Sequence, residues 1–245
     1  MIPARKSPLL DGLLYMYFRS LWRGAFSGIY LRGSEHLIGL PLDRPVIAYA
    51  NHTNWWDLLM VFRLTRVLRQ KKFYGMMEEK QLSPYRFFSW LGAFSVDLSA
   101  PGRAGTGLRY AVKLLRDPHS LLWVFPQGQL CTAYEPFALK PGLEFLIKHA
   151  PEASILPWAF RYEFFRDDRP VVLMEVGKLI TSAEASPENL KSRCETLCQN
   201  LLEIAKSRDL TGFECLEKPG LTINKRWEYL LCSLRGKAHE FNPRN

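Results

Sequence analysis

The chain has 245 residues, of which 47% are hydrophobic, and a formal net charge of +9. This length and apolar content fit one domain with its own core and exclude a mainly disordered or low-complexity chain. The charge favours an anionic partner, with nucleic acid, a membrane surface and an acidic cofactor all open. The five cysteines are odd in number and form no Cys-x-x-Cys pair, so we expect neither a disulfide framework nor a zinc ribbon.

Residues 1–33 combine basic, aliphatic and aromatic side chains. Their apolar positions recur at helical spacing with Arg19 and Arg23 beside them, which predicts a basic amphipathic helix. The uninterrupted apolar run 13–18 is much shorter than the roughly 20 residues of a bilayer-spanning helix. Two interpretations stay open, a helix in the headgroup layer of a membrane and a surface helix docked on its own domain. We assign residues 34–245 to the main domain.

Strand and helix patterns alternate through the main domain. Apolar runs predict strands at 46–50, 73–77, 93–96, 120–126, 154–157 and 171–177. Amphipathic stretches predict helices near 56–68, 85–90, 106–115, 141–148 and 187–208. The alternation predicts an α/β fold with a mixed, largely parallel sheet flanked by helices, preceded by the N-terminal amphipathic helical segment. The sequence beyond Gly212 shows no pattern that assigns its structure.

A histidine and an aspartate follow the first of these strands. His52 and Asp57 lie where a buried strand turns into a helix, which places them at the carboxyl edge of the sheet, where α/β active sites usually lie. A histidine base whose tautomer is held by a carboxylate is the pair needed to deprotonate a hydroxyl that attacks a thioester. By spacing alone the pattern is weak. The alternative is that His52 caps the helix and Asp57 lies in its solvated first turn.

Four short blocks follow one another over roughly residues 46–177. They are Asn51-His52 with Asp57, Gly92 to Asp97, Phe125-Pro126-Gln127-Gly128, and Ile155-Leu156-Pro157. In this order they closely resemble the glycerolipid acyltransferase family, which contains the lysophosphatidate acyltransferases. Four ordered blocks are specific, although each block alone is weak.

The resemblance implies an O-acyltransferase in which His52 is the general base on an acceptor hydroxyl and Asp57 orients it. The donor is expected to be an acyl-CoA or acyl carrier protein thioester, and the acceptor a lipid, foremost 1-acyl-glycerol-3-phosphate or a related lysolipid. The resemblance implies no cofactor. It also implies a peripheral or monotopic protein on the cytoplasmic face of a membrane, with a hydrophobic groove for the acyl chain.

Two departures concern the acceptor. Relatives with phosphate-bearing acceptors typically show Phe-Pro-Glu-Gly-Thr-Arg, but here Gln127, Gly128, Gln129 and Leu130 follow Phe-Pro, and Asp97 is not followed by arginine. Arginine binds phosphate through two parallel hydrogen bonds, whereas amides suit hydroxyl groups, so a glycolipid or carotenoid glycoside stays open as acceptor. The alternative for Gln127 is that it closes its own turn. The predicted substrate-binding residues are Asn51, Phe125, Pro126, Gln127, Gly128, Gln129, Arg103 and Lys140.

A function of another class is a non-catalytic module that binds nucleic acid or an anionic membrane. The net charge and the 7 Trp, 10 Tyr and 15 Phe residues support it. The basic residues do not gather on one helix or stripe, so we expect no nucleic-acid partner. The other histidines, His36, His119, His149 and His239, are scattered singly, so we expect no metal site.

Overall fold

The computed structural model describes residues 1–99, 102–218 and 223–234. Its strands are β1 (Gly28–Arg32), β2 (Val46–Ala50), β3 (Lys72–Glu78), β4 (Ala93–Val96), β5 (Ser120–Val124), β6 (Ser154–Glu163), β7 (Val171–Val176) and β8 (Glu214–Glu217). They form one sheet in the order β4-β3-β5-β2-β6-β7-β1-β8. Neighbouring strands are parallel except at β6–β7 and β1–β8. The predicted α/β fold with a mixed, largely parallel sheet is confirmed.

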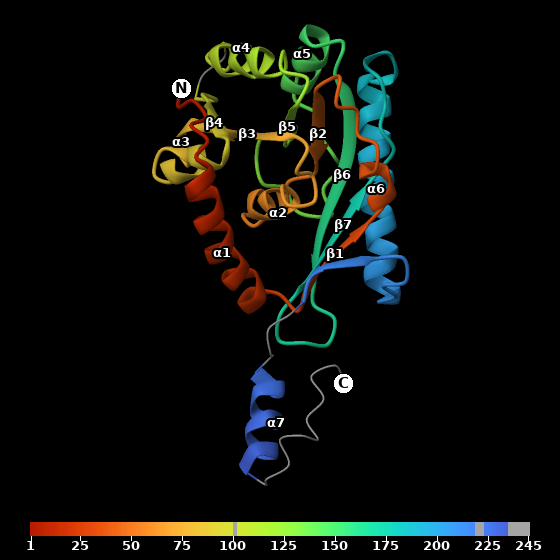
Figure 1. Ribbon diagram of the computed structural model, residues 1–245. Coiled ribbons are helices and arrows are strands. Elements are labelled where there is room, and N and C mark those ends of the chain that lie inside the picture. The colour runs from red at the N-terminus through yellow and green to blue at the C-terminus, as the bar shows by residue number, and fades with distance from the viewer. Residues whose placement is uncertain (100–101, 219–222, 235–245) are drawn as a thin grey trace.

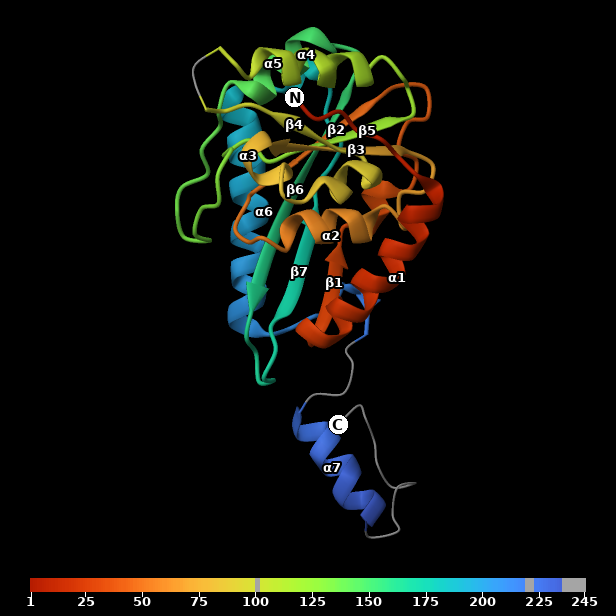
Figure 2. The same ribbon diagram turned by 90° about the vertical axis from the view of Figure 1, so that its left-hand side faces the viewer.

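Helices cover both faces of this sheet (Figures 1 and 2). The α-helices are α1 (Pro8–Ala25), α2 (Asp57–Leu64), α3 (Glu79–Leu82), α4 (Gly105–Leu114), α5 (Gly142–His149), α6 (Pro187–Ser207) and α7 (Ile223–Leu234). The described residues also contain three short 3₁₀ segments, η1 (Ser34–Leu37), η2 (Arg86–Leu91) and η3 (Ser182–Glu184). Buried residues of α1 and α2 form the core on one face, and those of α4, α5 and α6 form the core on the other. None of the helices in the described ranges is both long and apolar enough to cross a membrane.

The central strand β2 shows why its sequence is continuously apolar. All five of its residues are buried, because it lies between β5 and β6 and is covered on both faces. Successive side chains alternate between the two cores, with Ala48 on the α1/α2 side and Tyr49 on the α5/α6 side. The Tyr49 hydroxyl donates a hydrogen bond of 2.9 Å to the Leu190 carbonyl oxygen. This strand therefore fixes the position of the loop that follows it.

The N-terminal helix is shorter than predicted. It ends at Ala25, and residues 28–32, which we assigned to the helical segment, form β1 beside β7. The Ser27 backbone N–H donates to the Pro170 carbonyl oxygen at 2.9 Å, which brings the chain into the sheet. Apolar spacing did not separate the end of the helix from a short buried strand. The helix packs on the domain through the buried residues Phe18 and Trp22.

Two further elements differ from the sequence prediction. The strand expected at 154–157 continues to Glu163, because β6 pairs with β2 along its first half and with β7 along its second. The region near 85–90 is the 3₁₀ segment η2 rather than an α-helix. It ends at Leu91 and is followed by Gly92, whose φ of 106° only glycine adopts readily. The strand β8 and helix α7 occupy the stretch that the sequence left unassigned.

Candidate active site

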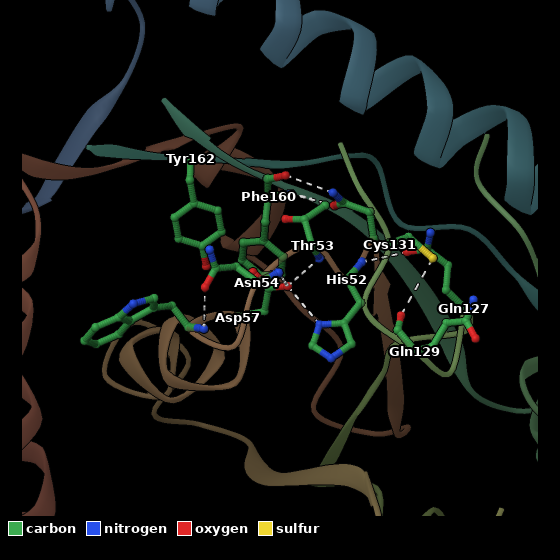
Figure 3. Close-up of polar contacts among 11 residues, drawn as sticks. His52, Thr53, Asn54, Asp57, Gln127, Gln129, Cys131, Phe160 and Tyr162 are labelled. Carbon is green, nitrogen blue, oxygen red and sulfur yellow. Dashed lines mark hydrogen bonds and ion pairs between the residues drawn. The ribbon is translucent and has the colours of Figure 1, made fainter. Parts of the chain in front are cut away.

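His52 and Asp57 are in direct contact at the carboxyl end of β2. His52 lies in the loop after β2, and Asp57 is the first residue of α2. His52 Nδ1 lies 2.8 Å from Asp57 Oδ2, as Figure 3 shows. The Asp57 side chain is fully buried, whereas that of His52 is 19% exposed. Asp57, in the first turn of α2, therefore contacts the histidine and is shielded from solvent. The alternative that Asp57 is a solvated first-turn residue is wrong.

Four donors surround the buried Asp57 carboxylate. Besides His52, its Oδ2 accepts hydrogen bonds from the backbone N–H groups of Thr53 at 2.8 Å and Asn54 at 2.9 Å. Its Oδ1 accepts from the Tyr162 hydroxyl at 2.7 Å. A buried charge is tolerated only when it is hydrogen-bonded, and these contacts meet that requirement. Burial raises the pKa of Tyr162 well above its usual value, and Asp57 adds to the rise, so Tyr162 stays a neutral donor.

The contact with Asp57 defines how the histidine ring can act. Because both Asp57 oxygens accept hydrogen bonds, the proton of a neutral His52 belongs on Nδ1, which leaves the lone pair on Nε2. The ring stacks on Phe125, with centroids 4.3 Å apart and planes at 18°. His52 also lines a cavity. A ring oriented in this way has a basic nitrogen available for a bound hydroxyl group.

The third block holds the backbone of His52. Gln127 Oε1 accepts a hydrogen bond of 2.7 Å from the His52 N–H, and Gln127 is only 4% exposed. The Cys131 N–H donates to the His52 carbonyl oxygen at 2.8 Å. The Gln127 side chain therefore does not close its own turn, and it does not line the cavity. It joins two loops, and its carbonyl oxygen is already engaged.

Asn51 ties the end of β2 to β6. Its Nδ2 donates to the Phe160 carbonyl oxygen at 2.9 Å, and its Oδ1 accepts from the Phe160 N–H at 2.8 Å. The side chain is buried, and both of its polar atoms bond to backbone. The residue predicted to bind substrate thus supports the loop that carries His52.

The cavity beside His52 has a volume of about 430 Å³ and mostly apolar walls. Among the predicted substrate-binding residues, those that line it are Phe125, Pro126, Gly128, Gln129 and Lys140. Arg103 does not line it. Arg103 is exposed and donates to Ser99 Oγ at 3.2 Å, with Asp97 at 3.7 Å.

Lys140 is the cation of this cavity, and Glu78 is its carboxylate. The Lys140 side chain passes over Gly128, which has a φ of 62°. The backbone conformation favours glycine there, and a Cβ would lie 2.9 Å from Lys140 Cδ, so the lysine side chain would have to shift to admit one. The Phe-Pro-Gln-Gly turn therefore brings the lysine chain close to the site.

Several residues of the site escaped the sequence prediction. Tyr162 is the most consequential, because it bonds to Asp57 from 105 residues further along the chain. Once β6 is known to extend to Glu163, strand alternation places Tyr162 on the same face as Phe160 and Trp158. That alternation was the available signal. The sequence did not predict the apolar wall formed by Met76, Met77, Leu108 and Leu143, because these residues belong to three different elements, β3, α4 and α5.

An α/β sheet with a His-Asp pair at the carboxyl end of a central strand, beside a mostly apolar cavity, is typical of an enzyme active site. The model of the acyltransferase family matches residues 29–161, more than half of the chain. The chain therefore belongs to the acyltransferase family and is an acyltransferase enzyme.

A solved structure supports the fold. The 1-acyl-sn-glycerophosphate acyltransferase PlsC from Thermotoga maritima is similar to this chain with a TM-score of 0.56 and 18% sequence identity. The alignment covers 82% of this chain and 79% of PlsC. No curated protein sequence matches the chain.

Proposed function

We propose that this acyltransferase moves a fatty acyl group from an acyl-CoA or acyl carrier protein thioester to the hydroxyl of a lipid. The observation that carries the proposal is the hydrogen bond from His52 Nδ1 to the buried Asp57, at the edge of an apolar cavity. The foremost acceptor is 1-acyl-glycerol-3-phosphate or a related lysolipid. PlsC, whose fold is similar, is named as an acyltransferase for such a glycerophosphate.

In the proposed reaction His52 Nε2 takes the proton of the acceptor hydroxyl. The oxygen attacks the thioester carbonyl carbon, a C–O bond forms, the C–S bond breaks, and the thiolate recovers the proton from the imidazolium. Asp57 stabilises the imidazolium that forms and keeps the ring in its orientation. No acyl group is attached to the protein at any point.

The cavity suits the acyl chain. Its apolar walls come from both sides of the sheet, with Leu58 and Met77 from the α1/α2 side and Leu108 and Phe145 from the α4/α5 side. Burial of a CH₂ group in such walls contributes about 0.8 kcal/mol, so a fatty acyl chain supplies enough binding free energy to hold the reacting ester near His52.

Lys140 supports a phosphate-bearing acceptor, because it places a cation in the cavity that His52 also lines. The second acceptor class is a glycolipid or carotenoid glycoside. It is supported by the exposed amide of Gln129 at the cavity edge and by the absence of arginine among the described residues that line the cavity. Gln127 no longer supports this class, since its oxygen bonds to His52.

We further propose peripheral association with the cytoplasmic face of a membrane. The outer side of α1 carries exposed apolar residues, of which Leu9 is 75% and Met16 71% exposed. A helix of this kind lies in the headgroup layer without crossing it. A lipid acceptor would then reach the enzyme from the leaflet.

The test is thiol release from palmitoyl-CoA in the presence of 1-acyl-glycerol-3-phosphate, together with detection of the diacyl product. His52→Ala should abolish both signals, while the control His119→Ala, an exposed histidine before β5, should leave them unchanged. Full turnover by His52→Ala would overturn the mechanism. Turnover of the donor only with a glycosylated lipid would replace the foremost acceptor by the second class.

A further inference from the structure

A second pocket lies on the α1 side of the molecule, between the C-terminal half of α1, the end of α2 and β8. Its volume is about 530 Å³. Charged residues dominate its wall: Arg19, Arg23, Arg63, Glu217 and Lys218. Arg63 lies in the last turn of α2, whereas His52 precedes its first turn. The length of that helix, about 12 Å, therefore separates this pocket from the candidate active site.

The pocket has a surplus of positive charge. Glu217 is 6% exposed and is the one carboxylate among the described residues of its wall. It pairs with Arg19 Nε through Oε1 at 3.0 Å and with Arg63 Nε through Oε2 at 3.7 Å. Four cations against one carboxylate leave an excess of three positive charges. Cations held close together are stabilised when an anion joins them.

Several donors in this pocket have no protein acceptor. Arg63 is 9% exposed, and its Nη2 donates to the Leu216 carbonyl oxygen, but its buried Nε makes no hydrogen bond within the described residues. The side chains of Arg23 and Lys218 make no hydrogen bond or ion pair with any residue that the structure describes. Guanidinium groups with free donors are the groups best suited to bind phosphate oxygens.

The pocket borders the exposed apolar side of α1. Met16 precedes Arg19 by three residues and Arg23 by seven, so these three side chains follow one another along the same face of the helix. The exposed apolar residues of this side are Leu9, Leu13, Met16, Tyr17 and Leu21. Basic groups beside an apolar helix face are the arrangement that binds the surface of an anionic membrane.

We propose that this pocket binds the phosphate monoester of an anionic lipid headgroup while the apolar side of α1 enters the same leaflet. A phosphate monoester carries more than one negative charge at neutral pH and three free oxygens, which match the surplus charge and the free donors. The lipid bound here is not the acyl acceptor, because that hydroxyl must reach His52. The inference does not depend on acyl transfer.

The test is co-sedimentation of the full-length protein with vesicles. Phosphatidylcholine vesicles with phosphatidic acid are compared with phosphatidylcholine vesicles that contain phosphatidylglycerol at equal surface charge. The variant Arg23→Gln/Lys218→Gln removes the two exposed cations of the pocket that do not pair with Glu217. The matched control Lys113→Gln/Arg116→Gln removes two exposed cations at the end of α4, on the other face of the sheet. Equal melting temperatures of all three proteins establish that they are folded.

The wild type should prefer phosphatidic acid, and the pocket variant should lose that affinity by on the order of tenfold, with little change in the control. Equal losses in both variants, or equal binding to the two anionic vesicles, would overturn the proposal. The last experiment measures the melting temperature of both proteins with inorganic phosphate. If it protects the wild type but not the pocket variant against heating, while vesicle affinity is the same for both, the pocket binds a soluble anion and the lipid assignment is wrong.

Discussion

The two sides of the candidate active site differ in how firmly the protein holds them. On the carboxylate side, Asp57 is fully buried and receives four hydrogen bonds, three from the loop after β2 and one from β6. On the cavity side, Lys140 provides the cation and Gln129 an exposed amide. The comparison indicates that the proposed proton-transfer groups are held by many contacts, whereas few polar groups line the cavity in which we propose that the acceptor binds. Substitutions on the first side should therefore change rate, and those on the second should change acceptor affinity.

Asp57→Asn should have the largest effect. The amide nitrogen can donate to His52 and so favours the wrong tautomer, which lowers kcat by on the order of 10⁴-fold. The measurement is steady-state transfer with acyl-CoA and lysolipid, and the control is Asp209→Asn, an exposed aspartate after α6. A loss below tenfold would mean that Asp57 does not control the histidine tautomer.

Tyr162→Phe should have the second-largest effect. It leaves Oδ1 of the buried Asp57 without its donor, which costs about 1–3 kcal/mol of stability and lowers kcat by roughly tenfold, with KM for the donor unchanged. Urea unfolding and steady-state kinetics measure the two changes. Tyr134→Phe, at a residue that is 79% exposed, is the matched control. An unchanged kcat would mean that the hydrogen bond from Tyr162 to Asp57 does not contribute to the rate of acyl transfer.

Asn51→Ala should mainly lower stability. It leaves the N–H and carbonyl oxygen of Phe160 without their side-chain partner in a buried place, at a cost of about 1–3 kcal/mol in the free energy of unfolding. Urea unfolding of Asn51→Ala and of the exposed control Gln199→Ala provides the comparison. If the two variants unfold at the same urea concentration, the hydrogen bonds of Asn51 between β2 and β6 contribute nothing to the free energy of unfolding.

Lys140→Gln should have the smallest effect, and on binding only. Loss of the cation should raise KM for a phosphate-bearing acceptor by about tenfold and leave KM for the thioester donor unchanged. Arg103→Gln serves as the control, because Arg103 lies outside the cavity lining and is exposed. An equal effect of both variants would place the acceptor phosphate between them, and an effect of Arg103→Gln alone would move it to the loop before α4.

The sequence predicted those parts of the fold and site that depend on neighbouring residues. The strand β2, the turn after it and the start of α2 are continuous in the chain, so the closeness of His52 and Asp57 followed from local structure. Gln127 was recognised as part of a motif, but its partner was not, because it lies 75 residues away. Contacts of this kind depend on the strand order, which the local pattern does not contain.

The N-terminal segment shows the same limit. Apolar spacing predicted the amphipathic helix α1, but it carried the helix into residues that pair with β7 and β8. A strand of five residues at this place is defined by its partners from the far end of the chain. The sequence did not predict the basic pocket either, because the pairing of β8 with β1 is what brings Glu217 to Arg19 and Arg63.

The central claim is that His52 and Asp57 act as one unit, and a double-mutant cycle tests it most directly. Single-turnover acyl transfer should be measured for the wild type, His52→Ala, Asp57→Asn and the double variant. If Asp57 works through His52, the double variant should be no slower than His52→Ala alone. Additive losses in the double variant, or transfer by His52→Ala at the wild-type rate, would contradict the account.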